Sequence, residues 1–238
     1  MKVFDKFIKQ TKDDIGTYSD KIYEVKKDSN WEKLKSSDLI LQGDTAVELG
    51  HPETKSTSYI MWTNTENKVS DNKITVIGPD LNEIKNSPID YAKITIIKTK
   101  KYDEDKAYEI FQEMEKLRLN INLEGYMIRA TSQKTREWCR VSKKALGKGF
   151  SFQILGSELI KSYKERDFID EVEIIFVVGQ KTLIDQLAKI GTKVTEITMA
   201  LNTIFDDIEF DCHSCNFSEI CDEIDGMKEM HRNKIGNK

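Results

Sequence analysis

Short apolar runs separated by turn-forming residues characterise the chain between residues 39 and 76. The runs cover residues 39–41, 46–49, 58–62 and 74–77, and the breaks include Gly43, Gly50 and the polar stretch 64–72. This pattern predicts strands joined by hairpin-like turns. Helical spacing is seen earlier for four apolar residues, Val3, Phe4, Phe7 and Ile8. We therefore expect a lead-in helix, followed by an irregular connection.

Strands and helices are predicted to alternate in the second half of the chain. The patterns favour strands over residues 92–97, 126–130, 150–154 and 172–178, and helices over 103–119, 132–146, 157–164, 181–190 and 192–205. Ser157 is the expected cap of its helix. The run 172–178 is almost continuously apolar, which is typical of a strand buried on both faces. The fold class is thus mixed α/β (α+β), with a β-rich first part followed by alternating strands and helices around a mixed sheet.

Composition narrows the class of protein. The chain has 238 residues, of which 38% are hydrophobic and 33% charged, and its net charge is −4. An acidic chain is not expected to bind nucleic acid or an anionic membrane through bulk charge. No apolar run approaches the length of a membrane span, and the N-terminus has no apolar signal core, so a cytoplasmic location is expected. We divide the chain into a lead-in segment (1–44), a mixed α/β domain (45–205) and a cysteine-rich tail (206–238).

Charge is distributed unevenly along the sequence. Residues 129–148 contain seven basic residues and one acidic residue, whereas residues 206–225 contain eight acidic residues and no Lys or Arg. On the helix expected over 132–146, one face carries four cations, Arg136, Arg140, Lys143 and Lys144. This face is either a solvated surface above a packed Trp138, or a site for phosphates or an acidic protein. Cys139 is expected to be a small buried apolar residue.

Three of the four cysteines lie close together in the acidic tail. The spacing Cys-x2-Cys-x5-Cys-x9-His places four ligand-type side chains within twenty residues: Cys212, Cys215, Cys221 and His231. Zinc and an iron–sulfur cluster both accept this donor set. A redox dithiol is less attractive because the acidic neighbours disfavour a free thiolate. His213 competes with His231 as the fourth ligand. There is no phosphate-binding loop motif and no nucleophile–histidine motif, so no catalytic residues are assigned.

Several separated segments resemble the acetyl-CoA synthase family, the beta subunit of the CO dehydrogenase/acetyl-CoA synthase complex. They are VELG at 47–50, KITVIGPD at 73–80, WCRVSK at 138–143 and GF at 149–150, followed by the cysteine tail. The resemblance implies the middle domain of that family and the start of its metal site, where four cysteines hold a [4Fe-4S] cluster bridged to nickel. Cys212, Cys215 and Cys221 match the first three of these cysteines, the third after a shortened gap, and His231 stands at the position of the fourth.

The resemblance also implies partners and limits. The family's middle domain is associated with ferredoxin and with coenzyme A, which suits the basic residues around Arg136 and Arg140. The sequence ends at Lys238 without the Cys-Gly-Cys nickel ligands of the family, so we expect an electron-transfer or accessory module and not a complete synthase. The alternative is a binding module in which zinc staples the tail while the basic face docks coenzyme A or an acidic partner protein. The sequence leaves open the metal, the fourth ligand, the partner, the oligomeric state and the role of residues 1–44.

Overall fold

The computed structural model describes residues 2–26, 31, 40, 43–101, 106–117, 121–129, 135–205, 215–224 and 226–227. Its helices are α1 (Asp5–Ile15), α2 (Ala107–Leu117), α3 (Lys143–Gly147), α4 (Phe152–Lys164), α5 (Lys181–Phe205) and α6 (Ser218–Glu223), with short 3-10 turns η1 (Gly43–Thr45) and η2 (Leu81–Glu83). Its strands are β1 (Asp20–Glu24), β2 (Ala46–Leu49), β3 (Ser56–Thr63), β4 (Lys73–Ile77), β5 (Tyr91–Thr99), β6 (Tyr126–Arg129), β7 (Trp138–Ser142) and β8 (Ile169–Val178). None of these described helices is long and apolar enough to cross a membrane.

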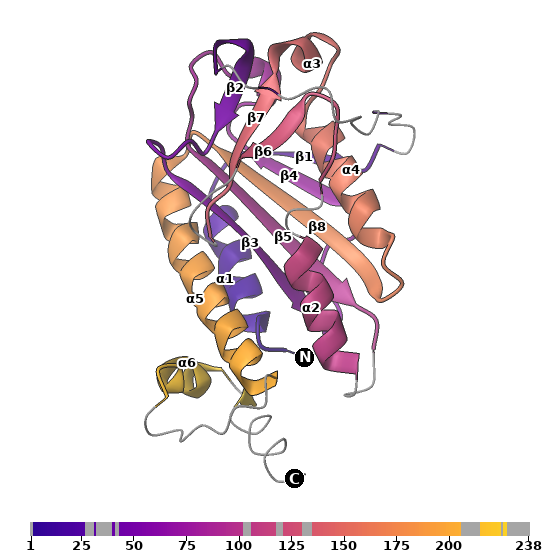
Figure 1. Cartoon of the computed structure of the whole chain (residues 1–238), viewed down its shortest axis with the longest axis vertical. Helices are drawn as coiled ribbons and strands as arrows, with labels where there is room; N and C mark the ends of the chain where they lie inside the picture. Colours follow the sequence, from indigo (N-terminus) through magenta and orange to yellow (C-terminus); the bar gives the residue numbers. More distant parts are fainter. Residues whose placement is uncertain are drawn as a thin grey trace.

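The larger sheet is mixed, with the strand order β1-β4-β8-β5-β3 (Figure 1). β3 pairs with β5 and β4 with β8 in parallel, whereas β5 and β8 are antiparallel. Every residue of the central strand β8 from Val172 to Val178 is buried. The prediction of a strand buried on both faces is therefore confirmed, as is the mixed α/β class with a mixed sheet.

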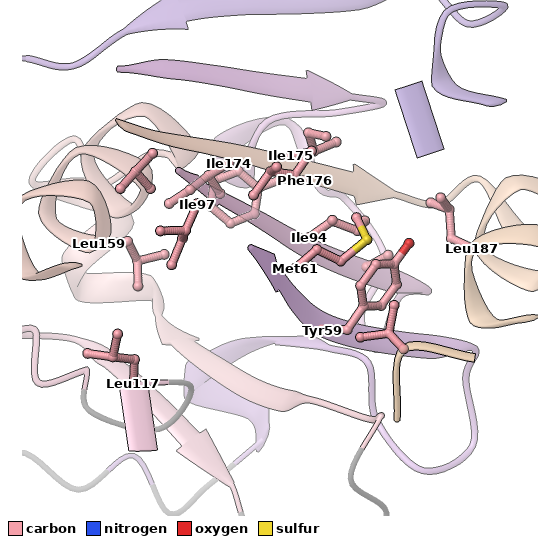
Figure 2. Packing of buried hydrophobic residues seen from close by; sticks show 14 of the residues in the cluster. Tyr59, Met61, Ile94, Ile97, Leu117, Leu159, Ile174, Ile175, Phe176 and Leu187 are labelled. Atoms are coloured by element: carbon pink, nitrogen blue, oxygen red, sulfur yellow. The ribbon is translucent and has the colours of Figure 1, made fainter. Parts of the chain in front are cut away.

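Helices cover both faces of this sheet. Tyr59 of β3 shares a hydrogen bond with Thr11 of α1, and α5 also packs against β3, so α1 and α5 lie on one face. Ile74 of β4 lies on the opposite face of the sheet and meets α4 at Gly156. Figure 2 shows both layers, with Leu187 of α5 near Tyr59 and with Leu159 of α4 near Ile97. The apolar core is continuous through these layers.

A three-stranded antiparallel sheet, β2-β7-β6, lies at one end of the molecule (Figure 1). The predicted strands at 46–49, 58–62 and 74–77 are confirmed, but the hairpin-like turns between them are not. β2 joins the small sheet, and β3 and β4 are separated by two strands of the large sheet. The turn residues correctly marked the ends of these strands. Which strands pair depends on how whole faces of the sheet are buried, and a local sequence pattern does not encode this.

Two predicted helices differ from the structure. The helix expected over 132–146 is wrong in its described part, because residues 138–142 form β7 and the helix begins only at Lys143. Cys139, Arg140 and Val141 are buried within a sheet, where alternate side chains face opposite sides. The helices expected over 181–190 and 192–205 are one helix, α5, which continues through Gly191. A Cβ at Gly191 would lie 2.9 Å from Thr57, so this glycine allows α5 to approach β3 closely.

The region around residue 150 was also assigned to the wrong element. The strand expected over 150–154 is absent, and α4 begins at Phe152 with Ser151 as its cap, its hydroxyl accepting from the Ile154 amide at 3.3 Å. Ser157 is not a cap but a buried residue inside α4, where its Oγ donates to the Gln153 carbonyl. The lead-in helix is confirmed as α1, but β1 was missed because an edge strand with an exposed Ile22 has no clear apolar alternation.

Candidate functional site

The four cations predicted to share a helix face are distributed over a strand, its approach and a short helix. Arg140 lies in β7 directly opposite Glu48 of β2. Its Nε and Nη2 atoms contact Glu48 Oε1 at 3.0 and 2.8 Å, and both side chains are largely buried. Arg140 Nη1 also donates to the carbonyl of Ile40 at 3.2 Å. This guanidinium is therefore held in place by a carboxylate from a strand 92 residues away in the sequence.

Trp138 lies beside Arg140 on the same face of β7. Its Nε1 donates to Glu48 Oε2 at 2.9 Å. The guanidinium carbons of Arg129 and Arg140 lie 5.2 and 5.5 Å from its ring, within the range of cation–π contact. Arg129 reaches Trp138 because the two residues are paired across β6 and β7. The ring of His51 meets the indole edge-on, with 4.9 Å between centroids.

The other three predicted cations surround this group. Arg136 Nη2 donates to the carbonyls of His51 and Thr54 at 3.0 and 2.8 Å, which ties the approach to β7 to the loop after β2. Lys143 donates to the Asp44 carbonyl at 2.6 Å, and Lys144 is exposed in the first turn of α3. The structure thus ties Arg136 to the loop after β2 and Arg140 to Glu48 of β2 itself. Lys143 and Lys144 follow on the next element.

Three residues that contact Trp138 or Arg140 were not singled out from the sequence: Glu48, His51 and Arg129. A usable signal was the alternation of apolar and polar residues from Cys139 to Ser142, which fits a strand as well as a helix and, as a strand, puts Trp138 and Arg140 on one face. The pairing with Glu48 had no local signal, because β2 and β7 are far apart in the sequence. We call Glu48, His51, Arg129, Trp138 and Arg140 the tryptophan–arginine cluster.

A buried ion pair lies behind this cluster, between the two sheets. Lys93 Nζ of β5 is 2.6 Å from Glu137 Oε2, and their side chains are 2% and 1% exposed. Glu137 also accepts hydrogen bonds from Ser58 and Tyr126, both at 3.1 Å. Burial, the largest single influence, lowers the pKa of Lys93, but Glu137, Tyr163 and Cys139 together raise it more, so the net pKa lies above its ordinary value. The ammonium is therefore charged, and it joins the large sheet to the start of β7.

Cys139 lies next to this pair and is fully buried. Burial raises the pKa of its thiol far above the ordinary range, and the nearby Glu137 carboxylate adds to the effect. A neutral thiol in an apolar site is neither a metal ligand nor a nucleophile under ordinary conditions. The prediction that Cys139 is a buried apolar residue is confirmed.

The predicted metal ligands are only partly within the described residues. Cys212 and His231 lie outside them, as does the competing His213, and no grouping of three or more metal-ligand side chains occurs in the described part. Cys215 lies in the turn before α6, and its Sγ accepts the backbone N–H of Phe217 at 3.4 Å. Cys221 lies within α6 and is half-buried against the apolar core. In metal sites, backbone N–H groups often donate to the sulfur of a cysteine ligand and stabilise the bound thiolate. The contact at Cys215 is of this kind.

The two candidate sites lie far apart. In Figure 1 the small sheet with the tryptophan–arginine cluster is at the top, and α6 is at the bottom. α5 has 25 residues and connects these regions, which corresponds to about 37 Å of helix. A small ligand on the cluster therefore cannot touch the cysteines of α6 in the same chain.

Comparison with known proteins identifies the family of the region that contains the tryptophan–arginine cluster. The sequence profile of the CO dehydrogenase/acetyl-CoA synthase complex beta subunit matches residues 33–183, more than half of the chain. The chain belongs to this family. The match contains β2 to β8 and therefore the whole cluster, whereas α1, β1 and the cysteine tail lie outside it.

Curated relatives give the same result at low identity. The chain is 28% identical over 181 residues to carbon monoxide dehydrogenase/acetyl-CoA synthase subunit alpha of Moorella thermoacetica, covering 74% of this chain and 24% of the relative. It is 29% identical over 157 residues to acetyl-CoA decarbonylase/synthase complex subunit beta of Archaeoglobus fulgidus, covering 65% and 29%. The chain thus spans about a quarter of the length of these relatives.

Proposed function

We propose that this chain contains a metal-binding module of the acetyl-CoA synthase family, with an electron-transfer or accessory role. Its ligands are Cys212, Cys215, Cys221 and His231, and its group is an iron–sulfur cluster of the [4Fe-4S] type. The observation that carries the proposal is the N–H···S contact between Phe217 and Cys215, in a chain of this family. When bound, such a cluster supplies one-electron chemistry.

The residues around the cysteines support this role. The N–H of Phe217 directs a positive dipole at the sulfur of Cys215, and a hydrogen bond of this kind orients a metal ligand and tunes its bond to the metal. Cys221 is half-buried, so its sulfur is partly withdrawn from solvent. The surrounding acidic residues favour binding of a cation, and a reducing cytoplasm keeps the thiols available.

Anaerobic purification followed by metal analysis and a visible absorption spectrum tests the proposal. We expect iron and sulfide with a broad absorption near 400 nm, about the region typical of such clusters. Cys221→Ser should lower the bound iron, whereas Cys139→Ala, the control, should leave it unchanged because Cys139 is buried in β7 and not in the region of Cys215 and Cys221. A colourless protein with stoichiometric zinc contradicts the iron–sulfur assignment, and a protein without metal contradicts the site itself.

A second candidate function is favoured by the tryptophan–arginine cluster. Here zinc cross-links the tail, and the basic region of Arg136, Arg140, Lys143 and Lys144, which the structure spreads over β7, its approach and α3, docks coenzyme A or an acidic partner such as a ferredoxin. Arg129 and Trp138 are half-exposed beside this region, and they offer a cation and an aromatic plane to a ligand with phosphates and a purine. Because Glu48 already engages Arg140, we assign the direct anion contacts to Arg129 and Lys144, with Arg140 shaping the region.

Titration with coenzyme A, followed by Trp138 fluorescence, tests this second function. Trp138→Phe identifies the signal against Trp31 and Trp62, and Lys144→Ala should weaken binding in a salt-dependent way. Lys181→Ala changes a cation of α5 outside the assigned anion contacts and serves as the control. A fluorescence signal that does not respond to coenzyme A, together with no salt-dependent binding of an acidic protein, contradicts this function.

A further inference from the structure

The short helix α6 rests on two helices, α1 and α5, that are packed on the same face of the large sheet. Contacts run from α6 to α5 and from α5 to α1. α1, α6 and most of α5 lie outside the matched family region. We call residues 215–224, which contain Cys215 and Cys221, the cysteine segment. This segment is therefore attached to a part of the chain that lies outside the family match.

Apolar side chains form the main attachment of this segment. Ile220, Ile224 and Met227 are 3%, 5% and 0% exposed and belong to the continuous core. Ile220 and Ile224 are four residues apart and so lie on one side of the chain. Cys221 follows Ile220 directly, so burial of Ile220 restricts where the sulfur can lie.

Ion pairs of Glu223 with two lysines further restrict the position of α6. Glu223 Oε1 is 2.8 Å from Lys6 Nζ of α1, and Glu223 Oε2 is 3.5 Å from Lys193 Nζ of α5. A single carboxylate thus links α6 to both underlying helices. None of these contacts involves a cysteine sulfur, so a metal bound by the cysteines would leave them intact.

The underlying helices are themselves firmly held. Phe4, just before α1, is fully buried with its ring centroid 4.5 Å from that of Trp62. Lys12 of α1 pairs with the buried Glu173 of β8 at 2.7 Å. The close approach of α5 to β3 at Gly191 fixes the second helix. α1 and α5 therefore offer α6 a support that belongs to the core of the domain.

We infer that α1 and α5 form a mount that holds the cysteine segment before a metal binds, with Ile220, Met227 and Glu223 as positioning residues for Cys215 and Cys221. This inference rests on the proposed metal site. The mount restricts the ligand backbone in advance, so less conformational freedom is lost when metal binds. Loss of the mount then weakens metal binding even though no ligand is changed.

The test uses the full metal-free chain with Co²⁺ as the probe. The thiolate-to-cobalt absorption band reports the dissociation constant, and amide hydrogen exchange reports protection of residues 215–224. Met227→Ala is compared with Met114→Ala, which removes an equally buried methionine from α2. Lys6→Ala is compared with Lys21→Ala, which breaks a different surface pair, with Glu83 at 2.6 Å.

Met227→Ala is expected to raise exchange over residues 215–224 and to weaken Co²⁺ binding about tenfold, the scale seen when groups behind metal ligands are removed. Lys6→Ala should weaken binding about two- to fivefold, the range of a partly exposed ion pair. The two control variants should keep wild-type affinity. Unchanged exchange and affinity in Met227→Ala overturn the mount.

The outcomes separate the mount from the metal site. If the wild-type chain shows no cobalt band, the proposed metal site is refuted and the mount loses its role in metal binding. If the band is present but Met227→Ala and Met114→Ala weaken it equally, the effect is general destabilisation and the mount is refuted.

Discussion

Replacing Lys93 by Met should be among the most damaging single changes in this chain. The substitution leaves the Glu137 carboxylate, 1% exposed, with the hydroxyls of Ser58 and Tyr126 as its hydrogen-bond partners among the described residues. Removing one member of a buried ion pair costs about 3–5 kcal/mol, because the remaining charge is desolvated without compensation. That is a large fraction of the roughly 5–15 kcal/mol by which a domain is stable.

Urea unfolding at pH 7 measures this cost. The net pKa of Lys93 lies above its ordinary 10.5, because the combined effect of Glu137, Tyr163 and Cys139 outweighs the lowering by burial. For a raised pKa, the stabilising contribution is fully present below the unfolded value and is lost only as pH rises through the folded value. The pair should therefore contribute constantly from neutral pH to about 10, and stability should fall above that pH.

Two further variants test whether the cost comes from burial of an unpaired charge. Lys93→Met with Glu137→Met removes both charges, so the double variant should be more stable than Lys93→Met alone. Lys21→Met breaks an equally short ion pair with Glu83, but that pair is exposed, so the midpoint of unfolding should shift far less. A Lys93→Met chain with a loss below about 1 kcal/mol, or a double variant no more stable than the single one, contradicts the assigned role of burial.

Three other changes test separate features of the fold. Gly191→Ala should destabilise the chain by about 1–3 kcal/mol in urea because α5 must move away from β3, whereas Gly147→Ala, with open space around its Cβ, should stabilise it by about 0.4–1 kcal/mol; equal effects would contradict the close approach. Cys139 should be alkylated only after unfolding, as followed by peptide mass spectrometry, and modification in the native chain would refute its burial. Glu48→Gln should lower stability by about 1–3 kcal/mol and shift the emission of Trp138, and an unchanged spectrum would place the indole outside the cluster.

The sequence predicted elements best where a segment is buried on a periodic face. The nearly continuous apolar run of β8 and the helical spacing at the start of α1 both place apolar residues where only one element can bury them. Cys139 was correctly predicted to be buried from its residue type, although it lies in β7 and not in the expected helix. The family relationship was also recognisable from four short strings, because they keep their order and separation along the chain.

Predictions of elements failed where two structures can bury the same residues. The segment from Trp138 to Ser142 has apolar positions compatible with a helix or a strand, and its pairing with β2 and β6 decides for the strand. Ser157 has the side chain of a helix cap, yet it lies inside α4 because Phe152 and Leu155 are buried together with it. Gly191 would usually weaken a helix, but in α5 it is needed for contact with β3.

The sequence by itself determined the residue types available to each candidate site: a basic segment, a group of thiols and the family strings. Only the tertiary structure decided their geometry. It pairs Arg140 with Glu48 and Lys93 with Glu137, and it places α6 at the opposite end of the molecule from the small sheet β2-β7-β6. The physical reason is that these partners are far apart along the chain, so their contacts form only when whole faces of sheets and helices are buried together.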